Sequence, residues 1–273
     1  MNVTDKYILS TKIKNWHAYI PMIGIAQLVF VSILIPFLDW SNLPMNAIIY
    51  PVIAALFNVI CVFVVIPLIQ KTDICHLVGF IYAYPIIVAI LSYFFLGELL
   101  SSSGYFAIFL IIMGIFTLTI RIKHLNCKVS WFSLGLAVLL TALNEFTIKI
   151  STNNMNEWNA LSISVLTYGV CLCLPLVYKK HRNSFLKNIL NIKYVFLSEL
   201  FSFFGIITLF LAIARLPVTV ATAIFSVQPM FVLILEGIVD SKISHISQDH
   251  KLLPKLGSIL LIVVGLVLLY LQI

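Results

Sequence analysis

The sequence predicts an all-α polytopic membrane protein built from two inverted five-helix repeats, residues 1–122 and 123–273. We expect nine full transmembrane helices, with the first helix of the first repeat largely missing. Hydrophobic residues fill 62% of the 273 positions, charged residues fill 10%, and the mean hydropathy is +1.10, far from the balance of a soluble domain. Long apolar runs recur along the whole chain, and its two halves resemble each other.

Nine segments are apolar over about 20 residues, the length that a helix needs to cross the hydrocarbon core of a bilayer. The connections between them are mostly short, so we expect no soluble domain between the spans. All four tryptophans lie at segment edges, where the amphipathic indole ring favours the headgroup region. The predicted spans are residues 18–38, 47–69, 73–97, 103–120, 130–150, 159–178, 194–214, 217–239 and 254–272.

Basic residues predict the orientation of these spans. Of the 17 lysines and arginines, all but Lys6, Lys149 and Arg215 fall in loops on one side. That side is the cytoplasm by the positive-inside rule, which places residues 1–17 inside and the C-terminus outside. The expected location is the bacterial inner membrane. The net charge of +7 is therefore a topology signal, and no nucleic-acid partner is expected because the basic residues form no patch.

An internal repeat is the most informative pattern in the chain. The stretch IPLIQKTDICHLVGFIYAYP aligns without gaps with FLAIARLPVTVATAIFSVQP. Lys71 then lies opposite Arg215, and Pro85 lies opposite Pro229, both at an offset of 144 residues. In each copy a basic residue ends one helix, a new helix begins within a few residues, and a proline interrupts that helix midway.

The repeat extends outward more weakly. Gly114 lies opposite Gly265, and Lys6 lies opposite Lys149 at an offset of 143 residues. The second copy has a complete span before its lysine, whereas the first copy has only a few residues there. We therefore infer a five-helix unit whose first helix is largely missing from the first copy. An odd number of helices per unit makes the two copies insert in opposite senses.

The stretch YAYPIIVAILSYFFLGELL has a mid-helix proline, Pro85, followed thirteen residues later by the glutamate of a "GE" turn, Glu98. Together with AIARLPVTVATAIFSVQP, it resembles the EamA-like branch of the drug/metabolite transporter superfamily, and the resemblance covers nearly the whole chain. NVTDKYIL is similar to the end of that family's first helix. The resemblance implies a ten-helix transporter of two five-helix repeats. The second copy departs from the pattern, because Lys242 stands where its glutamate would be.

The polar residues just before the paired prolines are the first candidate site. A mid-span proline removes a backbone hydrogen bond and frees carbonyls, which is tolerated where helices line a polar cavity. We predict helix kinks at Pro85 and Pro229. Pseudosymmetry would bring two sets of substrate-binding side chains together between the repeats: Tyr82, Tyr84, Ser226 and Gln228. Alternatively, the prolines only kink the helices for packing and the tyrosines anchor at a lipid interface.

Ionisable residues inside spans form the second candidate site, because each costs roughly 2.5–3.5 kcal/mol at a helix centre. Glu145 and Lys149 lie four residues apart, a spacing that permits an intrahelical ion pair, with Asn144 beside them. They are either substrate- or proton-binding groups of a cavity or a self-neutralised pair near the outer interface. Glu199 lies about one turn into its helix and is interpreted as an interfacial carboxylate stabilised by the helix dipole.

The predicted function is secondary transport of small metabolites, amino acids or drug-like solutes by alternating access between two inverted repeats, as an exporter or exchanger. No GxxxxGK[ST] signature occurs, so the energy would come from a proton gradient or from a counter-substrate. The expected partners are that solute and the lipid bilayer, and the chain would act as a monomer or homodimer. The alternatives are a flippase of a lipid-linked intermediate and a non-transporting membrane protein.

An intramembrane enzyme is not predicted. The sequence has neither HExxH nor GxSxG, and no pair of aspartates within the spans. Its five cysteines are odd in number and form no CxxC motif, which favours neither a disulfide framework nor a metal site. No cofactor is expected.

Overall fold

The computed structural model describes residues 2–38, 43–71, 74–120, 131–231 and 253–270. Within these ranges the regular elements are all helices. The α-helices are α1 (Asn2–Thr11), α2 (Trp16–Leu34), α3 (Ile49–Lys71), α4 (Ile74–Ile81), α5 (Pro85–Leu91), α6 (Ser102–Ile120), α7 (Trp131–Asn154), α8 (Glu157–Cys173), α9 (Lys179–Asn188), α10 (Ile192–Arg215), α11 (Val218–Phe225) and α13 (Leu253–Tyr270). Shorter 3-10 or π turns extend several of them: η1 (Ile35–Phe37), η2 (Met45–Ala47), η3 (Ser92–Leu96), η4 (Leu174–Val177) and η5 (Ile189–Asn191).

Five helical stretches in the described part of the chain are long and apolar enough to cross a membrane: Trp16–Leu34, Met45–Gln70, Trp131–Asn154, Glu157–Val177 and Lys179–Arg215. They correspond to five of the predicted spans, so the polytopic α-helical membrane class is confirmed. The other four predicted spans contain shorter apolar helices: Pro85–Leu96, Ser102–Thr117, Val218–Phe231 and Leu260–Leu269. Three of these spans, 73–97, 217–239 and 254–272, also include residues outside the described ranges. The count of nine full spans stays a prediction.

The chain forms two compact units, and each takes one segment from either half of the sequence. The first unit comprises Met1–Gln70 with Leu143–Leu216, and the second comprises Lys71–Ala142 with Pro217–Ile273. The chain passes from one unit to the other after Gln70, within α7, and after Leu216. Each unit therefore contains residues from both predicted repeats, 1–122 and 123–273.

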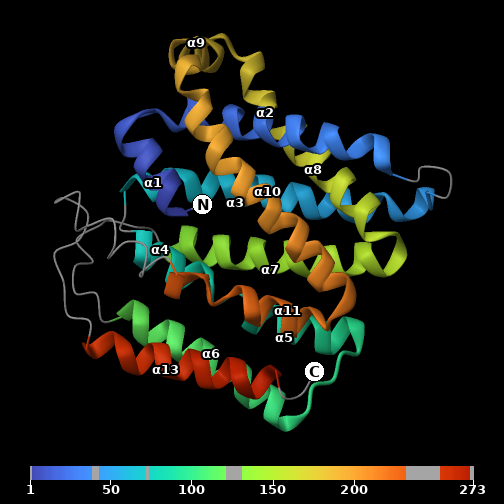
Figure 1. The fold of residues 1–273 in the computed structure, drawn as a ribbon. Helices are drawn as coiled ribbons and strands as arrows, with labels where there is room; N and C mark the ends of the chain where they lie inside the picture. Colours follow the sequence, from blue (N-terminus) through green and yellow to red (C-terminus); the bar gives the residue numbers. More distant parts are fainter. Residues whose placement is uncertain (1, 39–42, 72–73, 121–130, 232–252, 271–273) are drawn as a thin grey trace. The chain divides into compact units, whose positions relative to one another are not determined.

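In the first unit, α2 packs against α8, α9 and α10, and α1 packs against α10 (Figure 1). α2 and α8 approach closely because glycines face each other. A Cβ added to Gly24 would lie 2.8 Å from the carbonyl oxygen of Gly169, and one added to Gly169 would lie 2.6 Å from the Cγ of Leu28. Small residues that allow such backbone approach are typical of helix packing in membranes.

An asparagine side chain caps the N-terminus of both α2 and α8. Asn15 accepts a hydrogen bond from the backbone N–H of His17 at 3.0 Å, and Asn156 accepts one from the N–H of Trp158 at 2.9 Å. Each bond satisfies a helix-terminal donor that has no partner within its helix. α2 and α8 therefore begin in the same way.

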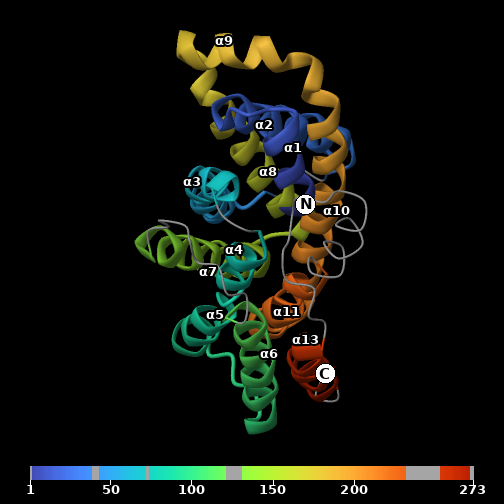
Figure 2. The ribbon, with the colours of Figure 1, turned by 90° about the vertical axis from the view of Figure 1, so that its left-hand side faces the viewer.

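In the second unit, α6 lies beside α13 along most of its length, as both ribbon views show (Figures 1 and 2). Gly114 and Gly265, which the repeat places opposite each other, both lie in this contact. A Cβ on Gly114 would meet the backbone oxygen of Ser258 at 2.8 Å, and one on Gly265 would meet that of Ala107 at 2.8 Å. The close approach of α6 and α13 therefore depends on both glycines.

Candidate functional site

Helices of the second unit break just before each paired proline. α4 ends at Ile81, and α5 begins at Pro85. α11 ends at Phe225, and the helical turn that follows at 228–231 contains Pro229. Proline has no N–H, and its ring conflicts with the carbonyl four residues earlier, so a regular helix is disfavoured through either position.

The segments before the two prolines meet in the second unit. The Tyr82 hydroxyl donates a hydrogen bond to Oε1 of Gln228. Both side chains are partly buried, and the two residues are 146 positions apart in the sequence. The structure therefore brings together one predicted residue from each half of the sequence.

The other two residues of the predicted site lie deeper in the second unit. Tyr84 is buried, and its ring centroid lies 5.9 Å from that of Tyr82. Ser226 is fully buried, and its hydroxyl donates a 2.6 Å hydrogen bond to the carbonyl of Ala223 within its own turn. Ser226 thus pairs with its local backbone, whereas Tyr82 contacts both the ring of Tyr84 and the side chain of Gln228.

The GE turn caps the helix that leads to the second proline. Gly97 has φ +65°, the left-handed conformation that favours glycine, and it directs the following Glu98 toward α11. Both carboxylate oxygens of Glu98 accept a hydrogen bond from the backbone N–H of Val218, at 2.9 and 3.3 Å. A carboxylate at a helix N-terminus complements the helix dipole, so Glu98 stabilises α11.

Sequence reasoning missed a buried hydroxyl pair in this unit. Ser92 and Thr219 lie 2.7 Å apart through their side-chain oxygens, and both are almost completely inaccessible to solvent. They link the end of α5 to the start of α11. Lone hydroxyl residues within apolar helices are too common to single out from a sequence.

Glu145 and Asn144 lie in the first unit, at the centre of α7. Oε1 of Glu145 accepts a 3.4 Å hydrogen bond from Nδ2 of Asn144, and its Oε2 is buried without a partner among the described residues. Both side chains are buried inside the protein. The carboxyl group is therefore a polar group within the protein interior.

Lys149, the third residue predicted there, directs its ammonium group to the end of α10. Its Nζ donates hydrogen bonds to the carbonyls of Ile213 and Leu216, both at 2.8 Å. Carbonyls in the last turn of a helix have no partner within the helix, and a cation there complements the helix dipole. Lys149 therefore caps the end of α10.

Lys6 makes the same contact in the first half of the chain. Its Nζ donates a 2.7 Å hydrogen bond to the carbonyl of Ile69 and a 3.5 Å bond to that of Gln70, at the end of α3. Ile69 and Ile213 are related by the 144-residue offset, and Lys6 and Lys149 by the 143-residue offset. The two copies therefore share one corresponding contact, from the lysine to this isoleucine carbonyl.

A buried carboxyl group that sequence reasoning did not single out lies on α1. Asp5 is 0% exposed, and its Oδ1 accepts hydrogen bonds from the Tyr19 hydroxyl at 2.7 Å and the Ser198 hydroxyl at 3.0 Å. These partners come from α2 and α10. Asp5 therefore joins three helices of the first unit.

Glu199 lies in the same region and not at an interface with solvent. It is 1% exposed, as is Gln27, whose Nε2 donates a 2.7 Å hydrogen bond to Oε2 of Glu199. The prediction of an interfacial carboxylate is wrong, because the face of α10 that carries Ser198, Glu199 and Ser202 packs inward.

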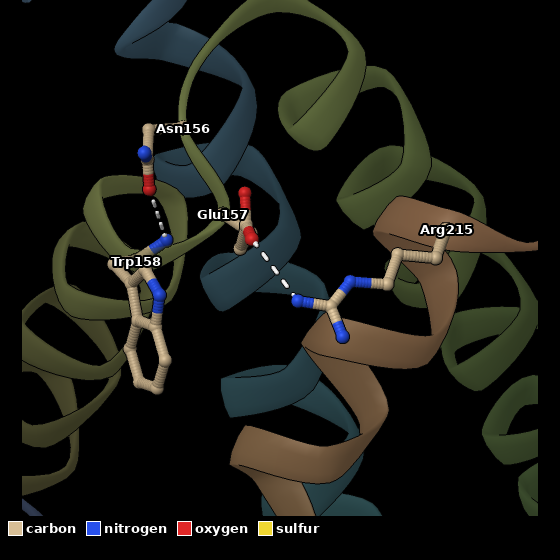
Figure 3. A network of polar contacts seen from close by, with 4 residues as sticks. All are labelled: Asn156, Glu157, Trp158 and Arg215. Carbon is tan, nitrogen blue, oxygen red and sulfur yellow. Dashed lines mark hydrogen bonds and ion pairs between the residues drawn. The ribbon is translucent and has the colours of Figure 1, made fainter.

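A polar corner at the other end of α10 is partly exposed. Arg215, whose side chain is 72% exposed, reaches Oε1 of Glu157 at 4.0 Å (Figure 3). Glu157 follows the capping residue Asn156 and precedes Trp158, so the ion pair connects the start of α8 to the end of α10. An exposed pair of this kind contributes about 0–1 kcal/mol, and its role is local.

Comparison with known proteins identifies the chain. The sequence model of the EamA-like transporter family matches residues 130–271. A chain in a solved crystal structure is similar in fold, with a TM-score of 0.64 and 11% identity over 99% of this chain and 95% of that one. Among curated proteins, no match was found.

Long apolar helices, close glycine contacts and buried polar groups define an integral membrane protein of the helical-bundle class. The family match covers more than half of the sequence. The chain therefore belongs to the EamA-like transporter family, within the drug/metabolite transporter superfamily. Its class is that of a membrane transporter with a small-molecule substrate.

Proposed function

We propose that the protein is a secondary transporter that moves a small solute by alternating access between two inverted repeats. The observation that carries this proposal is the hydrogen bond between Tyr82, in the turn before Pro85, and Gln228, which directly precedes Pro229 and follows the break after α11. Interrupted helices in membrane transporters leave backbone groups available to a substrate near the middle of the bilayer. Irregular backbone is tolerated at that depth only where protein or a polar cavity surrounds it.

The matching lysine contacts support the two-repeat architecture. Lys6 caps α3 and Lys149 caps α10 through aligned residues, although the two lysines lie in separate halves of the sequence. Gly114 and Gly265 support it as well, since each makes room for the helix that carries the other. Two repeats with opposite orientations in the membrane can each adopt the conformation of the other. This change opens a central site to one side of the membrane and then to the other.

The chemistry of the interrupted turns favours a neutral or zwitterionic solute with an apolar part. Tyr82 and Tyr84 offer aromatic surface, and Gln228 offers an amide that donates and accepts hydrogen bonds. Amino acids, small metabolites and drug-like compounds fit this description. We propose that the protein exports or exchanges such solutes across the bacterial inner membrane, with its C-terminus outside.

Flux measurements in proteoliposomes test this proposal. A pool of labelled amino acids and small metabolites is offered to the purified protein, and exchange is measured for the wild type, Gln228→Ala and Tyr82→Phe. We expect wild-type exchange and a loss of about tenfold or more in each variant, because a substrate-orienting contact disappears. Glu157→Gln, which changes an exposed ion pair, should exchange solute at the wild-type rate.

Failure of the folded wild type to exchange any solute in the pool would contradict the proposal. A second assay on the same vesicles would then follow labelled lipid-linked intermediates across the bilayer. Movement of such lipids would assign the flippase function, and its absence would assign a non-transporting role.

A further inference from the structure

Two buried carboxyl groups of the first unit lie outside the proposed solute site. Asp5 comes from α1 and Glu199 from α10, and α2 supplies a hydrogen-bond partner to each of them, Tyr19 for Asp5 and Gln27 for Glu199. All four side chains are at most 1% exposed. Ser198, next to Glu199 on α10, also donates to Asp5. The carboxyl groups therefore belong to one polar cluster shared by three helices.

This cluster has more acceptors than donors. Oδ2 of Asp5, Oε1 of Gln27 and Oε1 of Glu199 are buried, and none has a hydrogen-bond partner among the described residues. Buried polar atoms are normally paired, so an unpaired atom needs an explanation. Three unpaired oxygens, two of them on carboxyl groups, call for a ligand that donates hydrogen or carries positive charge.

The surrounding titratable groups are acidic or neutral, apart from the N-terminal amino group, whose positive charge acts on both Asp5 and Glu199. Asp5 and Glu199 interact electrostatically with each other, and Tyr19 interacts with both of them. Tyr168, on α8, interacts with the same two carboxyl groups and with Cys61 of α3. Neither the two tyrosines nor the thiol can supply a positive charge.

The neighbouring lysines are engaged at helix ends. Lys6 follows Asp5 in the sequence, but its ammonium group donates to carbonyls at the end of α3. Lys149 of α7 donates to carbonyls at the end of α10. Both ammonium groups therefore donate hydrogen bonds to backbone carbonyls outside the acceptor cluster.

We propose that Asp5, Gln27 and Glu199 form the binding site for a small cation, a proton or Na⁺, that couples its gradient to solute transport. This inference rests on the proposed transport function and specifies how it is driven. A bound proton adds to a carboxylate oxygen as an O–H group and can donate to Gln27 Oε1. It enters from water on one side of the membrane and leaves to water on the other, so the site returns to its starting charge.

The position of the site explains how binding would affect conformation. Without a cation, two like charges repel across the contact of α1, α2 and α10. Neutralisation removes this repulsion and stabilises the packed arrangement, so the cation favours one conformation over another by its differential affinity. Such differential binding is what coupled transport requires.

Paired flux assays in proteoliposomes test the site. The wild type, Asp5→Asn and Glu199→Gln are compared in solute exchange without a gradient and in accumulation under a pH gradient or a Na⁺ gradient. The amides keep the shape of the carboxyl groups but cannot bind a proton or balance a cation. We expect both variants to retain exchange and to lose gradient-driven accumulation, while Glu157→Gln behaves as the wild type. The gradient that drives the wild type identifies the cation.

Two flux results would overturn the site: a wild type that exchanges solute but ignores both gradients, or variants that accumulate solute as the wild type does. A wild type without exchange would instead contradict the proposed function. In that case infrared difference spectroscopy of the folded protein still decides the inference, because pH steps or added Na⁺ should produce a carboxyl signal. That signal should be lost in Asp5→Asn and Glu199→Gln and kept in Glu157→Gln, and its absence from the wild type would disprove cation binding.

Discussion

At the scale of single residues, Lys149 shows why a charge can persist inside a membrane protein. Lys149 is only 9% exposed, and its ammonium group donates hydrogen bonds to two carbonyls at the end of α10. Buried charges are expensive unless they are hydrogen-bonded or paired. The helix end supplies both hydrogen-bond acceptors and partial negative charge. Lys149 is therefore a stabilising residue of the first unit.

Replacing Lys149 by methionine should lower stability, because the side-chain volume remains while the cap of α10 is lost. We expect a decrease of about 2 kcal/mol in the free energy of unfolding, the upper range for a partly buried charge at a helix end. Thermal unfolding of the detergent-solubilised protein measures this loss of stability. The exposed Lys180 gives the matched control Lys180→Met, which should leave stability nearly unchanged. Equal unfolding temperatures for the two variants would exclude the capping role.

Sequence reasoning at this scale found some site residues and missed their partners. It selected Tyr82 and Gln228 because each lies close before a proline, and these two do form a hydrogen bond. The spacing of Glu145 and Lys149 on one helix carried no information about the carbonyls of α10. Asp5 was missed because its burial depends on Tyr19 and Ser198, which come from other helices.

At the scale of helices, the contact between α6 and α13 depends on the absence of side chains. A Cβ on Gly114 would lie 2.6 Å from Cγ1 of Ile262 and 2.8 Å from the backbone oxygen of Ser258. A side chain can rotate away, whereas a backbone oxygen moves only if the helix moves. Gly114 therefore sets the distance between the two helices.

Gly114→Ala should separate α6 from α13 and destabilise the second unit by about 1–3 kcal/mol, the usual cost of overpacking. Gly135→Ala is the matched control, since a Cβ there would meet no atom within 4 Å and alanine favours a helix. Thermal unfolding should therefore show a lower transition for Gly114→Ala and an unchanged or higher one for Gly135→Ala. A Gly114→Ala variant as stable as the wild type would indicate that the helices adjust freely.

Helix positions were predictable because hydropathy and length report them directly. The interruptions of the helices before the paired prolines were predictable only in part. Proline marks an interruption near Pro85, but the end of α4 at Ile81 depends on tertiary packing. The surroundings of Glu199 were predicted wrongly. Its position in the sequence indicates its depth along α10, but not which helices cover the face of α10 that carries it.

At the scale of the whole molecule, the repeat explains why each compact unit draws on both halves of the chain. Met1–Gln70 joins Leu143–Leu216, and Lys71–Ala142 joins Pro217–Ile273. The boundaries Gln70 and Leu216 fall near the aligned basic residues of the two copies. Sequence self-similarity could reveal the correspondence between copies, but not this exchange of segments, because contact between distant segments leaves no local pattern.

The distribution of basic residues predicts the orientation of the whole chain in the membrane. Almost all of the 17 lysines and arginines fall in loops on one side, including the exposed pair Lys179 and Lys180 at the start of α9. Retention of positive charge in the cytoplasm should place this loop inside and the C-terminus outside.

Alkaline phosphatase is active only outside the cytoplasm, so it should be active when fused after Ile273 and inactive when inserted next to Lys180. A green fluorescent protein that matures only in the cytoplasm should give the opposite pattern at the same positions. Activity of both phosphatase fusions, or the reverse pattern, would contradict the predicted topology.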